Sequence, residues 1–470
     1  MSRRVVVVGG GVAGLATAYR LAGGSGGAHA VPSDLDVVVL EAEGSPGGKV
    51  RSVDVAGIEV EAGPDSLLAR KPAGVELCRE LGLGPELEAP ASSTTLIWTD
   101  RGLLPFPSGP FGITTDLGEL WRWPGMSRRG KVRAAMDLLR RPAPPGSDGS
   151  LGALLRRRLG DEATERLVAP LLGGLFAADV DALSVRATFP ELESWERDHG
   201  SLIRGARAAA RIARDRAAGP IFLRPRGGLR RLTDALCAAL GPERVRCGVR
   251  VERIEPKGSG YSVWAGGEVW AADSVVIAAP AFVAADLLEG LAPVAARELA
   301  SVPHVSTAVA VLVYPEGSAS ALPDSSGFVV PRGRLAMTAC TFVSRKWPDE
   351  ALGDRAVVRC FVGSAGVEDV AFAPEEDIVW GVSRQLAALL PLPDRPEGAR
   401  VVRWPTAMPQ YEVGHLERVD RIERALPPGM FVVGQTYRGV GIPDCIRGAG
   451  EVAARLRAYL TGDLEGARVS

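Results

Sequence analysis

The hydrophobic positions of this chain fall into two patterns, short apolar runs and longer amphipathic stretches. Val5–Val8 and Asp36–Leu40 are short β-branched runs, which are typical of buried strands in a parallel sheet. Val275–Pro280 is a third apolar run, closed by its proline. By contrast, alternating apolar and polar positions at Val305–Val313, Gly327–Val330 and Ala356–Val362 predict a second, more antiparallel sheet.

Amphipathic stretches predict the helices. The clearest lie at Leu15–Leu21, Ala73–Leu83, Leu117–Trp121, Lys131–Leu139, Leu151–Leu159 and Leu232–Leu240. Residues 116–220 are mainly helical by pattern, and Val245–Ile254 reads as one strand. Strands alternate with a helix again between residues 225 and 280, so we expect the chain to return there to the sheet that begins at its first strand.

This pattern predicts an α/β (α+β) fold in three parts. We expect a parallel-sheet part from residues 1–90, 221–290 and 400–470. An antiparallel-sheet part is expected from residues 91–115 and 291–399, and a helical part from residues 116–220. A length of 470 residues fits two or three domains of ordinary size.

The composition of the chain mainly shows which partners and locations are not expected. The formal net charge of −1 gives no reason to expect nucleic acid as a partner. The six cysteines and four histidines are scattered without metal-ligand spacing, so we expect no metal and a reducing cytoplasm. No apolar stretch is long enough for a signal core or a spanning helix, so we expect a cytoplasmic protein, at most peripheral on a membrane.

The first strand runs into a glycine-rich turn. The stretch is Gly9-Gly10-Gly11-Val12-Ala13-Gly14, and a helix follows. Strand, GxGxxG and helix in this order are the dinucleotide-binding fingerprint. We expect Gly9 to allow the tight turn, Gly11 to admit the pyrophosphate and Gly14 to let helix and strand pack closely.

An acidic residue and a second glycine pair strengthen the fingerprint. Glu41 ends the second strand, where a carboxylate can accept a hydrogen bond from a ribose hydroxyl. It lies further from Gly14 than usual, and a Gly-, Ser- and Pro-rich surface loop at 22–35 accounts for the excess. Glu41 to Lys49, ending Gly47-Gly48-Lys49, resembles the E-x(5)-G-G-[RK] extension of the flavin amine oxidase and desaturase superfamily. This resemblance implies FAD rather than NAD, with Gly48 and Lys49 beside the phosphates.

One amphipathic stretch is strongly basic. Arg128, Arg129, Lys131, Arg133, Arg140 and Arg141 surround Val132, Met136, Leu138 and Leu139. Such a helix can rest on anionic lipid. A solvated helix with an inward apolar stripe is the simpler interpretation, and the sequence favours it.

Several segments, taken in order, resemble the oxygen-dependent protoporphyrinogen/coproporphyrinogen oxidase family across essentially the whole chain. They are Gly63–Ser66 with Arg70–Pro72, Arg166–Asp179, Leu183–Pro190, Pro225–Leu229, Cys340–Phe342, Gly414–Val419 and Tyr437–Cys445. One departure is Phe176-Ala177-Ala178-Asp179, where members more often carry Tyr-Ala-Gly-Asp. The resemblance implies an oxidase that uses FAD and dioxygen to aromatise a porphyrinogen, with hydrogen peroxide as co-product.

The resemblance also implies the roles of the three parts and the site. Residues 1–90, 221–290 and 400–470 would form a Rossmann-like FAD-binding domain, residues 91–115 and 291–399 an antiparallel-sheet substrate domain, and residues 116–220 a helical subdomain. The cofactor shell would comprise Gly9 to Gly14, Glu41, Gly48, Lys49, Gly63, Pro64, Asp65, Ser66, Val251, Trp404, Val440, Gly441 and Ile442. No acid–base residue is expected, because pyrrole N–H groups release the protons. Peripheral membrane contact and a downstream haem-pathway enzyme as a partner are further implications; the oligomeric state is left open.

The identity of the porphyrinogen rests on charge. Coproporphyrinogen carries four propionates and protoporphyrinogen two, so the former calls for additional cations. Arg70 and Lys71 follow the flavin-proximal segment and are candidates to bind propionates, which favours the coproporphyrinogen-oxidising branch. Protoporphyrinogen IX oxidase is the alternative. More distant alternatives are another flavin amine oxidase or desaturase, and a non-catalytic protein of the Rab GDP-dissociation-inhibitor kind.

Overall fold

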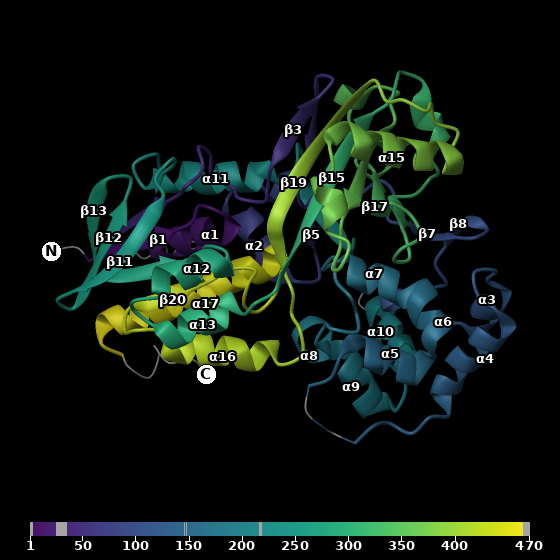
Figure 1. The fold of residues 1–470 in the computed structure, drawn as a ribbon, viewed down its shortest axis with the longest axis horizontal. Coiled ribbons are helices and arrows are strands. Elements are labelled where there is room, and N and C mark those ends of the chain that lie inside the picture. Colours follow the sequence, from purple (N-terminus) through teal and green to yellow (C-terminus); the bar gives the residue numbers. More distant parts are fainter. Residues whose placement is uncertain (1–2, 25–34, 145, 147, 216–218, 464–470) are drawn as a thin grey trace.

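The computed structural model describes residues 3–24, 35–144, 146, 148–215 and 219–463. Three parts are visible in Figure 1, a nucleotide-binding part around β1 and α1, a second sheet with α15 and a group of short helices. Most of the surface loop predicted at 22–35 lies outside the described residues. The mixed α/β fold class predicted from the sequence is confirmed.

A parallel sheet forms the centre of the nucleotide-binding part. Within the described residues its strands follow the order β10 (Val245–Arg246), β2 (Asp36–Leu40), β1 (Arg4–Val8), β14 (Ser274–Ile277) and β20 (Met430–Val432). Every neighbouring pair is parallel. β1 and β2 are buried apart from their first residues, as expected for strands covered on both faces.

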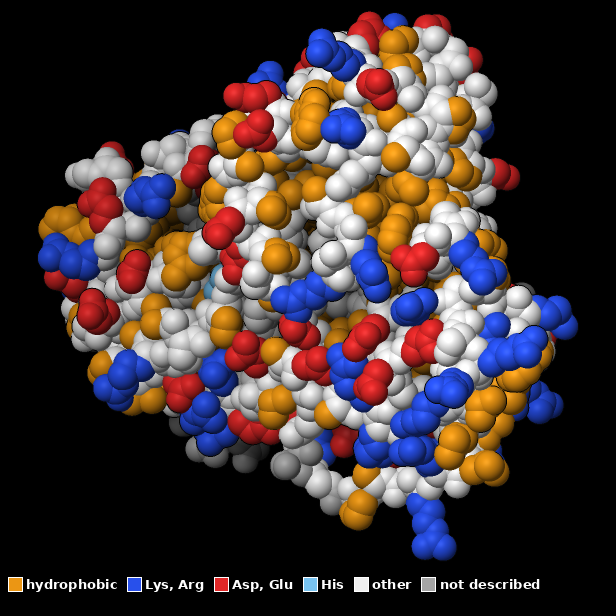
Figure 2. Space-filling view, turned by 45° about the vertical axis from the view of Figure 1, so that its right-hand side comes forward, with side chains coloured by type: hydrophobic (Ala, Val, Ile, Leu, Met, Phe, Trp, Pro, Cys, Tyr) orange, Lys and Arg blue, Asp and Glu red, His pale blue; other side chains and the backbone are white. Residues whose placement is uncertain are grey.

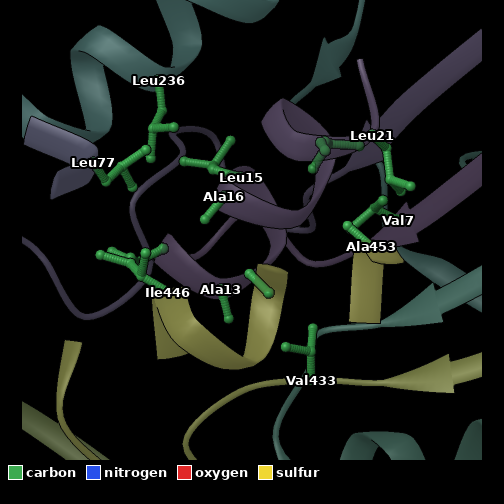
Figure 3. Packing of buried hydrophobic residues seen from close by; sticks show 14 of the residues in the cluster. Val7, Ala13, Leu15, Ala16, Leu21, Leu77, Leu236, Val433, Ile446 and Ala453 are labelled. Carbon is green, nitrogen blue, oxygen red and sulfur yellow. The ribbon is translucent and has the colours of Figure 1, made fainter. Parts of the chain in front are cut away.

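Helices cover both faces of this sheet. On one face α1 (Val12–Leu21) packs with α17 (Ile442–Thr461), α11 (Arg230–Leu240) and α2 (Pro72–Glu80). Figure 3 shows side chains of these helices meeting around Leu15 and Ala16. The other face carries α12 (Ala281–Leu288), α13 (Pro293–Ala300), α16 (His415–Ala425) and a small antiparallel sheet of β11 (Val251–Lys257), β12 (Gly260–Ala265) and β13 (Glu268–Ala272).

The predicted strand Val245–Ile254 is wrong as a single element. The structure divides it between β10 of the parallel sheet and β11 of the small antiparallel sheet. Gly248 lies between them with a φ of +74°, a backbone conformation that favours glycine. The division brings Val251 to the end of β2, because Val249 N donates to the Glu41 carbonyl at 2.8 Å.

The second sheet is mixed. Its strand order within the described residues is β19 (Gly398–Pro409), β15 (His304–Val313), β18 (Val357–Val362), β17 (Met337–Phe342), β16 (Gly327–Val329), β7 (Thr95–Thr99) and β8 (Gly102–Pro105). All neighbours are antiparallel except β16 and β7. Helix α15 (Glu375–Leu389) packs on one face, and the hairpin β3 (Ser52–Val55) and β4 (Ile58–Glu61) on the other. Two further short elements bear on the site, namely β5 (Leu67–Leu68) and α14 (Val343–Lys346).

The third part consists of short helices around one apolar core (Figure 1). They include α3 (Leu117–Arg122), α4 (Arg128–Ala135), the 3-10 turn η3 (Met136–Leu138), α5 (Leu151–Leu159), α7 (Ala169–Gly174), α8 (Val185–Thr188), α9 (Pro190–His199) and α10 (Leu202–Asp215). In its interior Arg158 pairs with Asp137 at 2.5 Å, and both side chains are completely buried. The hydroxyl of Ser201 also donates to Asp137, so this buried charge is well satisfied.

The inward apolar stripe predicted for the basic helix is wrong. In α4 and η3 the buried positions are Gly130, Lys131, Ala134 and Asp137, whereas Val132 and Met136 are exposed. Lys131 points inward because its ammonium donates to the Trp121 carbonyl at 2.8 Å, at the end of α3. Val132, Met136 and Leu139 therefore face outward, whereas Leu138 is half-buried against the apolar core of this part.

Candidate flavin site

The turn between β1 and α1 has the geometry that a dinucleotide-binding loop needs. Gly9 has a φ of +105°, and a Cβ on Gly14 would lie 2.0 Å from the Gly9 carbonyl oxygen, so both positions require glycine. A Cβ on Gly11 would meet no atom within 4 Å. Gly11 is the N-cap of α1, and the first backbone N–H groups of a helix form a ready anion-binding site. The open side of Gly11 is thus the side from which phosphate can approach.

Glu41 stabilises this turn from the end of β2. One carboxylate oxygen accepts from Gly10 N at 2.6 Å and the other from Glu43 N at 2.8 Å, with the side chain buried. A carboxylate offers about four acceptor sites, so two remain for ribose hydroxyls. The role of Glu41 as a brace for the glycine turn is an addition to the sequence prediction.

The second glycine pair lies against the first turn. Gly47 N donates to the Gly10 carbonyl at 2.8 Å, and a Cβ on Gly48 would lie 3.2 Å from the Gly11 Cα. Burial lowers the pKa of Lys49 to about 8. Among the described residues, only the Cys445 thiol acts against this effect of burial, and no carboxylate does, so the charge of Lys49 is available to an anionic ligand.

Ion pairs and a hydrogen bond connect the Gly63–Ser66 segment to the second sheet and to α14. Asp65 pairs with Lys346 of α14 at 2.9 Å and with Arg359 of β18 at 3.2 Å. Arg359 also donates to the Gly63 carbonyl. Burial alone would raise the pKa of the Asp65 carboxyl, but the two cations hold it far below its ordinary value. The carboxylate of Asp65 is therefore directed to these cations, and its role is to fix the backbone of the segment.

The same segment contacts the other predicted residues. A Cβ on Gly63 would lie 1.9 Å from the Lys49 carbonyl oxygen, so the two backbones touch. Trp404 of β19 donates through its indole nitrogen to the Ala62 carbonyl at 3.0 Å. Ser66 donates to Asp65 at 2.9 Å, and Pro64 is exposed. The structure thus brings Lys49, Gly63 and Trp404 together.

The last predicted group is the C-terminal glycine turn, residues Gly439–Ile442. Gly439 has a φ of +134°, and Gly441 is the N-cap of α17. The thiol of Cys445 in the first turn of α17 is close enough to the Lys49 charge for each to influence the other's pKa. Two helix N-termini, those of α1 and α17, therefore flank the space beside Lys49.

The two predicted propionate-binding residues have partners within the protein. Lys71 pairs with Asp444 of α17 at 2.7 Å, although its side chain is about half exposed (49%). The Arg70 guanidinium stacks over the Phe111 ring, 5.3 Å from its centroid. Both lie at the protein surface near the start of α17, but the Lys71 charge is balanced by a carboxylate that the sequence prediction did not include.

These features fit FAD. Glycine turns, an acidic brace and the half-buried cation Lys49 are the features of a dinucleotide-binding flavoprotein oxidoreductase. The family model of the flavin containing amine oxidoreductases matches residues 12–457. The chain belongs to this family, and its cofactor is FAD.

Individual relatives cover nearly the whole chain. It is 35% identical over 458 residues to coproporphyrinogen III oxidase of Bacillus subtilis (strain 168). This alignment covers 94% of this chain and 96% of that protein. It is 31% identical to the chloroplastic protoporphyrinogen oxidase of Oryza sativa subsp. japonica, over 98% of this chain and 89% of that protein. The crystal structure of a protein assigned as a protoporphyrinogen oxidase, from Exiguobacterium sp. 255-15, superimposes with a TM-score of 0.84 at 31% identity and covers 99% of both chains.

Proposed function

We propose that the chain is an FAD-dependent oxidase that aromatises coproporphyrinogen III to coproporphyrin III, with dioxygen as oxidant and hydrogen peroxide as co-product, in haem biosynthesis. The observation that carries this proposal is the similarity over 94% of the chain to a protein named coproporphyrinogen III oxidase. The site supports it, because glycine turns, Glu41 and Lys49 together suit a bound dinucleotide. A role in haem biosynthesis also implies that the enzyme is cytoplasmic and that a downstream enzyme takes up the coproporphyrin.

The proposed reaction does not need a general acid or base from the protein. A bound flavin supplies a two-electron acceptor that dioxygen regenerates, and pyrrole N–H groups release the protons. Aromatisation is strongly favourable, so the residues of the chain need only hold the macrocycle in place and exclude water. The proposed cofactor residues hold the flavin, and Arg70 and Lys71 are the residues proposed to hold propionates of the macrocycle. No residue is proposed as a general acid or base.

The substrate branch is tested by offering purified holoenzyme coproporphyrinogen III and protoporphyrinogen IX separately in air, and following porphyrin fluorescence. Faster formation of coproporphyrin supports the proposal. Preference for protoporphyrinogen would overturn the branch and favour the alternative that the rice relative's name suggests. A protein that binds FAD and oxidises neither would overturn the proposal as a whole.

Lys71 is proposed to bind a propionate at the edge of the site, sharing its charge with Asp444. Lys71→Ala should weaken the use of coproporphyrinogen more than that of protoporphyrinogen, because only the former has the additional carboxylates. Ratios of kcat/KM for the two substrates measure this effect. Lys257→Ala, which removes an exposed lysine of β11, is the control; an equal loss on both substrates for Lys71→Ala would contradict the proposal.

We also propose that the helical part, residues 116–220, rests peripherally on anionic membrane. No described helix has both the length and the apolar composition needed to cross a bilayer. However, α3, α4 and η3 enclose an apolar groove of about 470 Å³, with Trp121, Val132, Met136 and Leu139 at its walls. Leu139 is 84% exposed. Figure 2 shows Lys and Arg side chains gathered beside hydrophobic ones on this part of the surface. The exposed cations here include Arg128, Arg129, Arg140 and Arg141.

A further inference from the structure

We propose that Tyr411 is a positioning residue for the flavin, because it holds the C-terminal glycine turn in place and ties that turn to the helical part. This inference rests on the proposed contact of Val440–Ile442 with the cofactor, but on nothing about the porphyrinogen. Tyr411 follows β19 and is completely buried. Its phenol belongs to none of the sets predicted from the sequence.

The hydroxyl of Tyr411 makes two hydrogen bonds to the segment that leads into the glycine turn. It donates to the Gln435 carbonyl at 2.6 Å and accepts from Gly439 N at 2.8 Å. One buried oxygen therefore bridges both ends of the connection between β20 and the turn. The φ of +134° at Gly439 lies outside the range that most residues adopt, so this backbone needs such support.

His415 completes the support. Its ring stacks on the Tyr411 ring, with 3.9 Å between centroids and 14° between planes. Its Nε2 donates to the Tyr437 carbonyl at 2.9 Å, between the two backbone groups that Tyr411 holds. Burial lowers the pKa of His415 to about 4, so the imidazole is neutral near neutral pH and Nε2 carries its proton as a donor.

The backbone around Tyr411 is joined to the helical part. Ser184 N, at the N-cap of α8, donates to the Tyr411 carbonyl at 2.8 Å. The side chain of Gln410 donates to the Phe176 carbonyl at 3.0 Å, and the Phe176 and Tyr411 rings are 5.9 Å apart. Val440 of the glycine turn packs against the same apolar core. Tyr411 is thus where the helical part, β19 and the turn meet.

Tyr411→Phe removes the bridging oxygen and keeps the ring. The variant should bind FAD about tenfold more weakly, since two buried backbone groups lose their partner at the turn. The measurement is titration of apo-protein with FAD, followed by flavin fluorescence, together with the visible circular dichroism of the bound flavin. The matched control is Tyr261→Phe, because Tyr261 is also buried and donates to the Pro428 carbonyl at 2.5 Å, but belongs to the small sheet.

The two tyrosine variants separate positioning from general stability. Both should lower the melting temperature, whereas only Tyr411→Phe should change the FAD dissociation constant and the visible circular dichroism. Should Tyr411→Phe fail to fold, His415→Phe, which keeps the stack and loses the bond to Tyr437, should give a smaller change of the same kind. Wild-type FAD affinity and flavin dichroism in the folded variants would overturn the proposal. No porphyrinogen is involved, so failure here is distinct from failure of the proposed substrate.

Discussion

At the scale of single residues, burial determines the charge of His415. Its pKa is about 4 in the folded protein against 6.5 ordinarily, first because of burial and also because Arg418 and Arg438 lie near. The unfolded chain therefore binds more protons between these values. The stability that the neutral imidazole contributes is fully present above about pH 6.5 and is lost as the pH falls toward 4. Over the whole interval the loss is about 3 kcal/mol.

Urea unfolding of wild type and His415→Phe at about pH 7.5 and about pH 5 measures this contribution. The wild type should lose more stability than the variant between the two pH values, because the variant has no imidazole to protonate. Equal losses would mean that other groups carry the pH dependence. The comparison uses the difference between two proteins, so carboxylates that titrate in both cancel.

Single-residue roles were predictable where they follow from a local motif. Gly9 and Gly14 have the tight-turn and close-packing environments that their spacing alone suggested, whereas the bracing of the turn by Glu41 was not predicted. The role of Asp65 could not be predicted from a local motif, because its ion-pair partners Lys346 and Arg359 are far away in sequence. A carboxylate in a conspicuous motif can serve the fold rather than the ligand, and only the tertiary structure reveals which cations it meets.

At the scale of elements, the turn between β1 and α1 allows a sharp test. Gly11→Val adds a side chain whose Cβ meets no protein atom within 4 Å, so the variant should fold. The added side chain should nevertheless block the approach of the pyrophosphate and abolish FAD binding. Gly14→Val should instead fail to fold, because its Cβ would lie 2.0 Å from the Gly9 carbonyl oxygen.

Circular dichroism and flavin content of the two purified variants distinguish these outcomes. Folded, colourless Gly11→Val together with insoluble Gly14→Val is the expected result. Stoichiometric flavin in Gly11→Val would place the phosphates elsewhere. A cleanly folded Gly14→Val would mean that the turn is looser than its contacts indicate.

Element positions were predictable where the pattern is long and regular. Leu151–Leu159 matches α5, and Val305–Val313 lies within β15. The failures arise where one local feature outweighs the pattern. Gly248 turned one apparent strand into two, and in α4 the bond from Lys131 to the Trp121 carbonyl placed a charged residue inside and apolar ones outside.

At the scale of the whole molecule, the apolar groove lies on the same part as a group of exposed arginines, away from the parallel sheet (Figures 1 and 2). These arginines are Arg128, Arg129, Arg140 and Arg141. The sequence raised lipid contact for this basic stretch but favoured an inward apolar stripe, because the orientation of α4 depends on the tertiary bond from Lys131 to the Trp121 carbonyl. Leu139→Glu should reduce binding to phosphatidylglycerol vesicles severalfold, because it sets a negative charge where an apolar side chain would enter an anionic surface. Binding of the wild type should fall in about 0.5 M salt.

Co-sedimentation of the full chain with phosphatidylglycerol and with phosphatidylcholine vesicles measures both effects. Val294→Glu is the matched control, since Val294 is also an exposed apolar residue, although less exposed (47%), and belongs to α13 on the nucleotide-binding part. Loss of binding in Leu139→Glu alone, and only on anionic vesicles, identifies the groove as the contact. Equal losses in both variants would show that overall charge governs binding. No binding by the wild type to either vesicle would remove the membrane from the proposal and leave the groove to a protein partner.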